Sequence, residues 1–258
     1  MIFVDYFWKW PDGLVWRISR SITEKSRRSR FSLFMRKCSP SSSSRVLDVG
    51  VGEGEGRFVN FFEEMYPWKS SVTALALTDL PEFRRAYPGV TLVIGDGCKL
   101  SFGDRAFDVV FSNAVIEHVG TKSDQKKFIS EACRVADRVF LSTPNRWFPV
   151  DAHTLIPFAH WLPMRWRNRI YHWFGRDYFA SEKRLRLIGE NELLSLVPPS
   201  HRAVLFRQRV FGWTSNLNLV LTRLEIVNNT SLMSFPRRRE SRINREYSFY
   251  SGSPHSRG

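Results

Sequence analysis

The sequence is poor in the residues that build disulfide frameworks and metal centres. It has 258 residues but only three cysteines, Cys38, Cys98 and Cys133, which lie far apart and form no C-x-x-C pair. This spacing indicates neither a disulfide framework nor a zinc cluster, and it favours a reducing, cytoplasmic setting. The six histidines form no H-x-x-x-H or H-E-x-x-H pair, so we expect no metal ligands.

Long apolar runs are also missing. No stretch approaches the roughly 18 apolar residues that a membrane-spanning helix needs. The first residues are apolar and aromatic, but Asp5, Lys9 and Asp12 interrupt them, which is not the pattern of a signal peptide. The length suits one core domain with appendages.

Acidic residues are scarce at the two ends of the chain and not in its middle. The net charge is +14, yet residues 45–143 carry 12 basic against 14 acidic side chains. Residues 1–37 carry nine against three, and residues 144–224 carry 12 against five. We expect these basic flanks to meet an anionic surface or substrate. The alternative is a solvated basic face without a partner.

Short apolar runs alternate with amphipathic stretches through the middle of the chain. Strands separated by helices predict βαβ units and a mostly parallel sheet covered on both faces. A final hairpin, with strands at 203–211 and 217–221, is expected to turn through residues 212–216. The other expected strands span 46–49, 72–77, 90–94, 107–111 and 139–142, with helices at 57–65, from Pro81, and at 122–135.

Composition divides the chain into three parts. Residues 1–44 read as a basic, aromatic, helical segment that ends in a serine linker, and residues 45–224 as the core domain. Within the core, residues 146–200 form an aromatic, arginine-rich insertion that we interpret as a lid. Residues 225–258 have too few apolar side chains to fold. This basic tail resembles a translated bacterial repeat element; the alternative is an arm for nucleic acid.

A glycine series follows the first predicted strand. Glycine at a strand end lets the backbone turn sharply and approach a ligand. The dinucleotide fingerprint G-x-G-x-x-G fails in both registers, because Glu55 and Arg57 stand where glycine is needed. What remains is D-x-G-x-G-x-G, formed by Asp48, Gly50, Gly52 and Gly54.

This pattern resembles motif I of the class I S-adenosylmethionine-dependent methyltransferases, and the matches lie within the type 11-like group that methylates small molecules and lipids. The resemblance covers residues 45 to about 224. It implies a Rossmann-like, doubly wound α/β fold whose seven-stranded, mostly parallel sheet has an antiparallel last strand. It also implies S-adenosylmethionine as the cofactor, with Asp48 holding the methionine amino group.

The same resemblance assigns the remaining cofactor contacts. Asp79, at the end of the second strand, is expected to bind the ribose hydroxyls, since a carboxylate accepts two hydrogen bonds from a diol. Glu82 competes for this role. Asp96 and Gly97 are expected at the adenine ring, and Asn113 beside the transferred methyl group.

The acceptor and the catalytic base stay open. His118 is either a general base or a histidine with a structural hydrogen bond, and His153 is a weaker candidate. The expected acceptor is a small or lipid-linked molecule. The alternatives are an RNA methyltransferase and a non-catalytic membrane-peripheral module. Nucleic-acid chemistry is disfavoured because Asn113-Ala114-Val115-Ile116 replaces the Asn/Asp-Pro-Pro-aromatic motif of base methylation.

The aromatic and basic flanks admit two interpretations. Tryptophan, tyrosine and arginine favour the interface of an anionic membrane, which predicts peripheral attachment through residues 1–37 and 146–178. In the other interpretation the aromatic side chains pack in a lid and the arginines are solvated.

Overall fold

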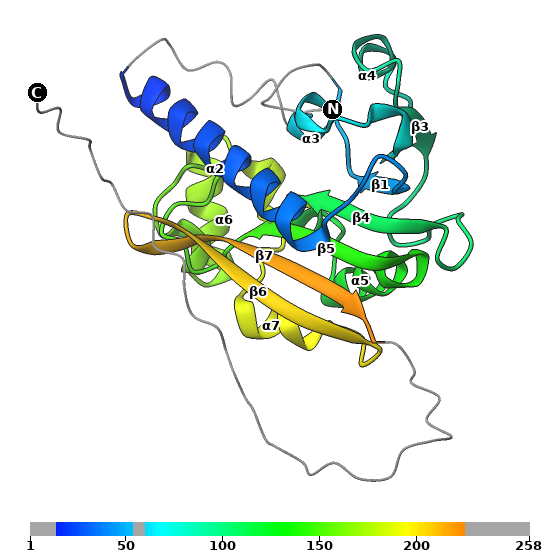
Figure 1. Ribbon diagram of the computed structural model, residues 1–258. Helices are drawn as coiled ribbons and strands as arrows, with labels where there is room; N and C mark the ends of the chain where they lie inside the picture. Colours follow the sequence, from blue (N-terminus) through cyan, green and yellow to red (C-terminus); the bar gives the residue numbers. More distant parts are fainter. Residues whose placement is uncertain (1–13, 54–59, 225–258) are drawn as a thin grey trace, which may run out of the picture.

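A seven-stranded sheet runs through the centre of the protein, in the order β3-β2-β1-β4-β5-β7-β6 (Figure 1). The structure is a computed structural model that describes residues 14–53 and 60–224. In chain order the strands are β1 (Val46–Val49), β2 (Val72–Ala76), β3 (Thr91–Ile94), β4 (Phe107–Asn113), β5 (Ala136–Pro144), β6 (His201–Val210) and β7 (Trp213–Arg223).

The first five strands are parallel, and β7 is antiparallel to both of its neighbours, β5 and β6. The predicted α/β fold with an antiparallel last strand is therefore confirmed. The order of the strands reverses at β1, where β2 lies on one side and β4 on the other. Open α/β sheets bind ligands at the carboxyl ends of the strands at such a point.

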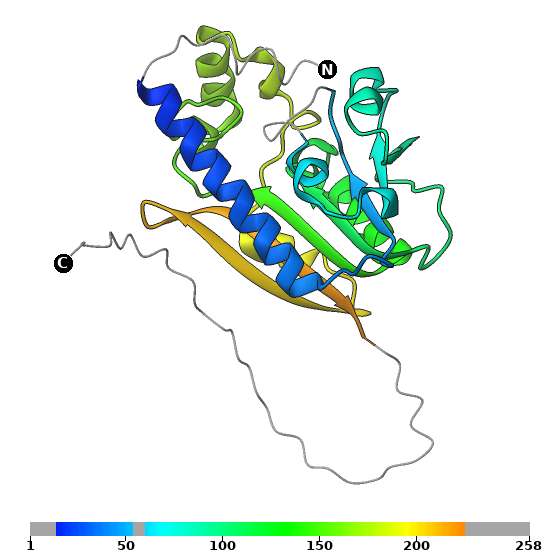
Figure 2. The ribbon, with the colours of Figure 1, turned by 45° about the horizontal axis from the view of Figure 1, so that its top comes forward.

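Helices cover both faces of the sheet (Figures 1 and 2). In chain order they are α2 (Leu14–Cys38), α3 (Phe61–Met65), η1 (Lys69–Ser71), α4 (Pro81–Ala86), η2 (Ile116–His118), α5 (Lys122–Val135), η3 (Ala159–Trp161), α6 (Met164–Trp173), η4 (Asp177–Ala180) and α7 (Glu190–Ser195). No helix in the described ranges is long and apolar enough to cross a membrane.

Two hydrophobic layers hold the helices on the sheet. On one face, side chains of α2, α3 and α4 pack on the strands, and Phe34 of α2 contacts Phe111 and Phe140 with ring centroids 5.2 and 5.7 Å apart. On the other face, Phe128 and Ile129 of α5 pack with side chains of α7. Burial of this apolar area is what fixes α2 against the sheet, at about 25 cal/mol per Å².

Two expected boundaries need correction. The hairpin between β6 and β7 turns at Phe211 and Gly212 alone, and not through the five residues expected, because both residues adopt positive φ angles of 49° and 82°. A two-residue turn of this kind matches the twist of paired strands. The expected helix at 57–65 is seen only as α3, and its first residues lie outside the described ranges, as do 1–13 and 225–258.

The segment between β5 and β6 lies beyond the carboxyl end of β5 (Figure 2). It contains η3, α6, η4 and α7. Two backbone hydrogen bonds fix it to the strand region: Arg186 N–H donates to the Glu117 carbonyl at 2.7 Å, and Asn145 N–H donates to the Ser215 carbonyl of β7 at 2.9 Å. The insertion therefore covers the edge of the sheet where β4 and β5 end.

Candidate active site

The chain turns sharply where β1 ends. Gly50 has a φ angle of +98°, and a Cβ atom built on it would lie 2.2 Å from Val115 Cγ2. Only glycine fits there, because an L side chain would be strained and would also clash. The next glycine, Gly52, exchanges two hydrogen bonds with the Asn60 side chain, at 3.1 and 3.0 Å. Gly54 lies outside the described residues.

Asp48 is buried in β1 beside a second carboxyl group, Glu63 of α3. Burial, and then the negative charge of Glu63, raise the pKa of Asp48 well above its usual range. Burial also raises the pKa of Glu63. Two buried carboxyls this close cannot both ionise cheaply, so their pairing favours a state in which they share a proton.

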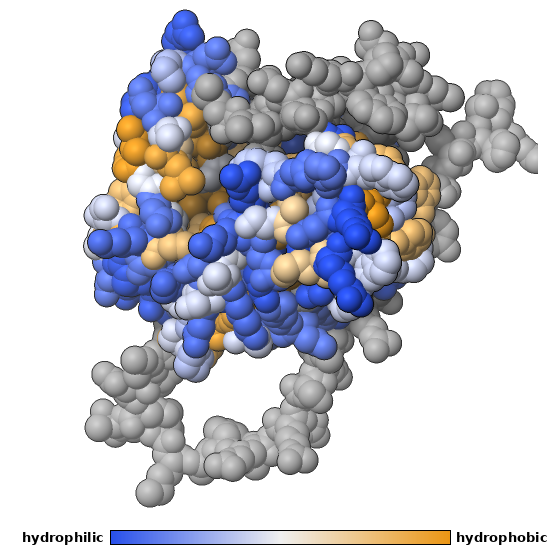
Figure 3. Space-filling view, turned by 180° about the vertical axis from the view of Figure 1, so that it is seen from behind, coloured by the Kyte–Doolittle hydropathy of each residue, from blue (hydrophilic) through white to orange (hydrophobic). Residues whose placement is uncertain are grey.

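The acidic residues that follow β2 and β3 are exposed. Asp79 pairs with Arg84 at 2.9 Å, and Asp96 accepts a hydrogen bond from Cys98 N–H at 2.8 Å. An exposed apolar residue comes two positions before each of them in the chain: Leu77 is 76% exposed and Ile94 is 54% exposed. Seen from behind, the corner that carries α4 shows a hydrophobic patch below a hydrophilic tip (Figure 3).

The structure shows the surroundings of two further residues that were expected near the cofactor, Gly97 and Glu82. A Cβ atom on Gly97 would lie 2.6 Å from the Phe128 ring, so the absence of a side chain there lets the loop pack on α5. Glu82, the competitor of Asp79, lies in the first turn of α4, and its backbone N–H donates to Glu53 Oε1 at 2.9 Å.

Asn113, the last residue of β4, is held by a side chain that the sequence did not single out. Arg30 of α2 is buried, and its Nη1 donates to Asn113 Oδ1. Burial, and then the charge of Arg27, lower the pKa of Arg30 to about 9. The following residue, Ala114, has a φ angle of 56°, a conformation that a non-glycine residue adopts only when its surroundings enforce it.

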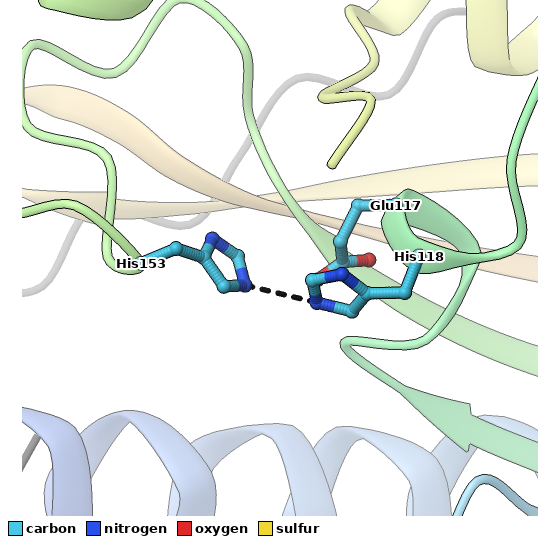
Figure 4. Close-up of side chains that lie close together, drawn as sticks. All are labelled: Glu117, His118 and His153. Atoms are coloured by element: carbon cyan, nitrogen blue, oxygen red, sulfur yellow. Dashed lines mark hydrogen bonds between the residues drawn. The ribbon is translucent and has the colours of Figure 1, made fainter. Parts of the chain in front are cut away.

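Glu117, His118 and His153 meet beside the end of β4 (Figure 4). Nε2 of His118 lies 3.1 Å from Nε2 of His153, and Nδ1 of His118 donates to the Arg184 carbonyl at 2.8 Å. Glu117 is fully buried, and its Oε2 accepts from Thr143 Oγ1 at 2.9 Å. Burial lowers the pKa of His118.

His153 is oriented by Asp151. The two side chains are joined by a 2.8 Å contact between Nδ1 and Oδ1, and both are largely buried. Asp151 also accepts from the N–H and the hydroxyl of Thr154, each at 3.0 Å. Burial alone would raise the pKa of Asp151, but the bond from His153 lowers it to about 2. Asp151 is thus an ionised carboxylate that raises the pKa of His153 against the effect of burial.

Known proteins are similar to this chain. Residues 47–138 match the methyltransferase domain family. The demethylmenaquinone methyltransferase of Roseiflexus sp. (strain RS-1) is 25% identical over 181 residues, which are 68% of this chain and 70% of that protein. The chain is a class I S-adenosylmethionine-dependent methyltransferase. It is therefore an enzyme, and the alternative of a non-catalytic membrane-peripheral module is excluded.

Solved methyltransferases share the fold. A putative methyltransferase from Bacillus halodurans C-125 superposes with a TM-score of 0.51 at 16% identity, over 75% of this chain and 98% of that one. The 1,6-didemethyltoxoflavin-N1-methyltransferase of Burkholderia thailandensis, solved with S-adenosylhomocysteine, has a TM-score of 0.50 at 18% identity, over 80% and 83% of the two chains.

The residues of this methyltransferase fit its cofactor, S-adenosylmethionine. Gly50 gives the sharp turn at the strand end, and the paired buried carboxyls of Asp48 and Glu63 suit a cationic group such as the amino group of this cofactor. The described atoms also leave Glu53 Oε2 buried without a hydrogen-bond partner. When bound, the cofactor supplies a methyl group on a sulfonium centre.

The structure brings the site together from segments far apart in the chain. Asp48, Gly50, Asp79, Asp96, Asn113 and His118 were expected from the sequence, and all lie at or just beyond the carboxyl ends of the parallel strands. Arg30, Glu63 and Glu117 were not expected. His153, the weaker candidate, contacts His118 directly.

Proposed function

We propose that this methyltransferase modifies a small-molecule or lipid-linked acceptor bound between Asn113, the His118–His153 pair and the insertion. The observation that carries the proposal is the buried chain of Asp151, His153 and His118 beside the end of β4. A carboxylate that orients an imidazole favours removal of a proton from a hydroxyl or amine. Such proton transfer contributes typically 10²–10⁴-fold to a rate.

Arg30 supports an acceptor that carries an oxygen or a negative charge. Its guanidinium is buried at the same strand end, and no ion pair with a carboxylate joins it in the described part of the chain. A buried cation of this kind favours an anionic or carbonyl group as its partner. The relative named for demethylmenaquinone agrees with an acceptor of that chemistry.

We propose the following cofactor contacts within the same function. Asp48 receives the amino group of the methionine moiety, and Asp79 the ribose hydroxyls. Asp96 receives the adenine amino group, while the exposed side chains of Leu77 and Ile94 offer apolar surface for the ring. Removing these side chains from water on ligand binding contributes at about 25 cal/mol per Å².

Transfer of a labelled methyl group tests the acceptor proposal. The purified full chain is incubated with labelled S-adenosylmethionine and a panel of quinols, phenols and amines, including demethylmenaquinone. We expect methylated product from at least one oxygen acceptor, and about a 100-fold loss in Asp151→Asn. Glu182→Gln, a change of an exposed acidic residue in the same insertion, serves as the matched control and keeps full activity.

We also propose that a lipid-linked acceptor is reached from an anionic membrane. On α6, Trp166 is 50% exposed and Trp173 is 88% exposed. The guanidinium groups of Arg165 and Arg169 lie 6.0 and 5.8 Å from the Trp166 ring. Interfacial tryptophans and adjacent arginines are typical of peripheral attachment, at about 1 kcal/mol for each basic residue near the surface.

Co-sedimentation with vesicles tests this attachment. Binding is expected with anionic vesicles at low salt, and it weakens with neutral lipid or at high salt. The double variant Arg165→Gln/Arg169→Gln binds less, whereas Arg202→Gln/Arg209→Gln, an equal change of charge at two exposed positions of β6, does not. Equal partitioning of the wild type to neutral and anionic vesicles contradicts the proposal and leaves the aromatic side chains as a lid.

A further inference from the structure

Three potential metal ligands converge from two segments of the chain. Glu117 and His118 come from η2, and His153 comes from the insertion (Figure 4). One carboxylate oxygen and two ring nitrogens lie within 4.8 Å of one another. Two histidines and one carboxylate are the donor set of many catalytic zinc sites.

Hydrogen bonds on the far sides of the two rings fix which nitrogen carries the proton. The Arg184 carbonyl can only accept, so Nδ1 of His118 is the donor. The Asp151 carboxylate likewise accepts from Nδ1 of His153 at 2.8 Å. In the neutral rings both Nε2 lone pairs then point at each other across 3.1 Å. Two lone pairs at this distance repel unless a proton or a metal cation lies between them.

Glu117 supplies the third donor. It is fully buried, and while Oε2 accepts from Thr143, Oε1 has no hydrogen-bond partner among the described residues. A buried carboxylate oxygen without a partner is costly, and a metal ion is one of the few groups that offsets the cost.

We propose that Glu117 Oε1, His118 Nε2 and His153 Nε2 bind one divalent transition-metal ion, for which Zn²⁺ is the probe. Ligand atoms about 2.0–2.1 Å from a tetrahedral ion stand about 3.3 Å apart, and the two ring nitrogens are 3.1 Å apart. Each ligand also has the outer hydrogen bond that orients metal-binding side chains: Asp151 on His153, the Arg184 carbonyl on His118, and Thr143 on Glu117.

Three protein ligands leave a fourth position on the ion, as in catalytic zinc sites. With the ion bound, both Nε2 atoms would be ligands, so the ion and not an imidazole would promote loss of a proton from an acceptor hydroxyl to water. This use of the site rests on the proposed function, whereas binding of the metal does not. The two claims are therefore measured separately.

Metal binding is measured on the full chain after dialysis against a chelator. Titration with Zn²⁺ by calorimetry, and with Co²⁺ by its visible absorption, is expected to show one site with the spectrum of a four-coordinate ion. Glu117→Gln, His118→Ala and His153→Ala lose the site, and Asp151→Asn weakens it about 10–100-fold. The control is His172→Ala, which breaks an exposed histidine–aspartate pair with Asp177 in the same insertion and leaves metal binding unchanged.

Binding of S-adenosylhomocysteine, followed by thermal shift, shows that each variant is folded. A wild type that binds this ligand but takes up neither Zn²⁺ nor Co²⁺ overturns the metal site, and the two rings then share a proton. Metal uptake that survives in all three ligand variants overturns it as well. A protein that binds metal through these ligands but methylates no acceptor retains the site and contradicts only the proposed function.

Discussion

Arg30 of α2 donates a hydrogen bond to the amide oxygen of Asn113, 83 residues away in the chain. This contact ties the N-terminal helix to the last residue of β4, where the cofactor and the acceptor are proposed to meet. The guanidinium is buried at a cost, because burial lowers the pKa of Arg30 to about 9. A residue kept at such a cost usually serves the site and not the stability of the fold.

We therefore expect opposite effects on function and stability from Arg30→Met. Methyl transfer falls roughly tenfold to a hundredfold, since a hydrogen bond from a charged group contributes about 1.5–3 kcal/mol. The melting temperature stays the same or rises, because a buried cation is replaced by an apolar side chain of similar length. Arg36→Met, on an exposed position of the same helix, changes neither quantity. A large fall in melting temperature would instead assign Arg30 to the core.

Gly50→Ala is predicted to destabilise the protein and to abolish cofactor binding. The φ angle of +98° strains any L side chain, and the new Cβ would lie 2.2 Å from Val115. Strain and overpacking each cost about 1–3 kcal/mol, so urea unfolding should show a loss of more than about 2 kcal/mol. Gly103→Ala, with no atom within 4 Å of the new Cβ, is the control. Val115→Ala should restore part of the loss; no restoration would argue against the clash.

Much of the fold follows from local pattern. The apolar runs and the helix between residues 122 and 135 agree with the observed elements, because each buries its own apolar face. The hairpin turn was misplaced because Trp213 to Asn216 resemble a loop by composition. Their pairing with β6 across a bulge at Gln208 and Arg209 decides the structure, and this is a tertiary effect.

Only part of the candidate site could be predicted from the sequence, because the other residues come together through tertiary packing. Asp48, Gly50 and Asn113 could be predicted because the residues next to them in the chain form recognisable motifs. His153 stands 35 residues from His118, outside any local metal-binding spacing, and Arg30 is one of many basic residues in its helix. Glu63 looks like an ordinary helical glutamate until α3 packs it against Asp48. Only the folded chain places these side chains together.

Asp79→Ala is predicted to weaken S-adenosylhomocysteine binding roughly tenfold to a hundredfold, the effect of losing a charge-assisted hydrogen bond. The variant also breaks the ion pair with Arg84, whose two side chains are about half exposed, and surface pairs contribute little to stability. The melting temperature of the free protein should therefore stay constant while the calorimetric Kd rises. Glu82→Ala is the matched control. Normal binding by Asp79→Ala with loss in Glu82→Ala would move the ribose contact to Glu82.

Cofactor binding is predicted to release a proton from the pair of Asp48 and Glu63. Burial and the second carboxyl raise the pKa of Asp48 in the free protein, so the pair stays protonated where an exposed aspartate is ionised. A raised carboxyl pKa costs stability as the pH rises from the unfolded value through the folded one. The incoming ammonium group stabilises the ionised form and lowers that pKa.

Two measurements follow from this linkage. Calorimetry of S-adenosylhomocysteine binding in buffers of different ionisation enthalpy should show net proton release, and the affinity should increase as the pH rises toward the raised pKa. Glu63→Gln removes the second carboxyl and keeps Asp48, so binding persists while the proton release diminishes. The same release in Glu63→Gln as in the wild type would show that the proton comes from another group. An affinity independent of pH would mean that Asp48 is already ionised before the cofactor arrives.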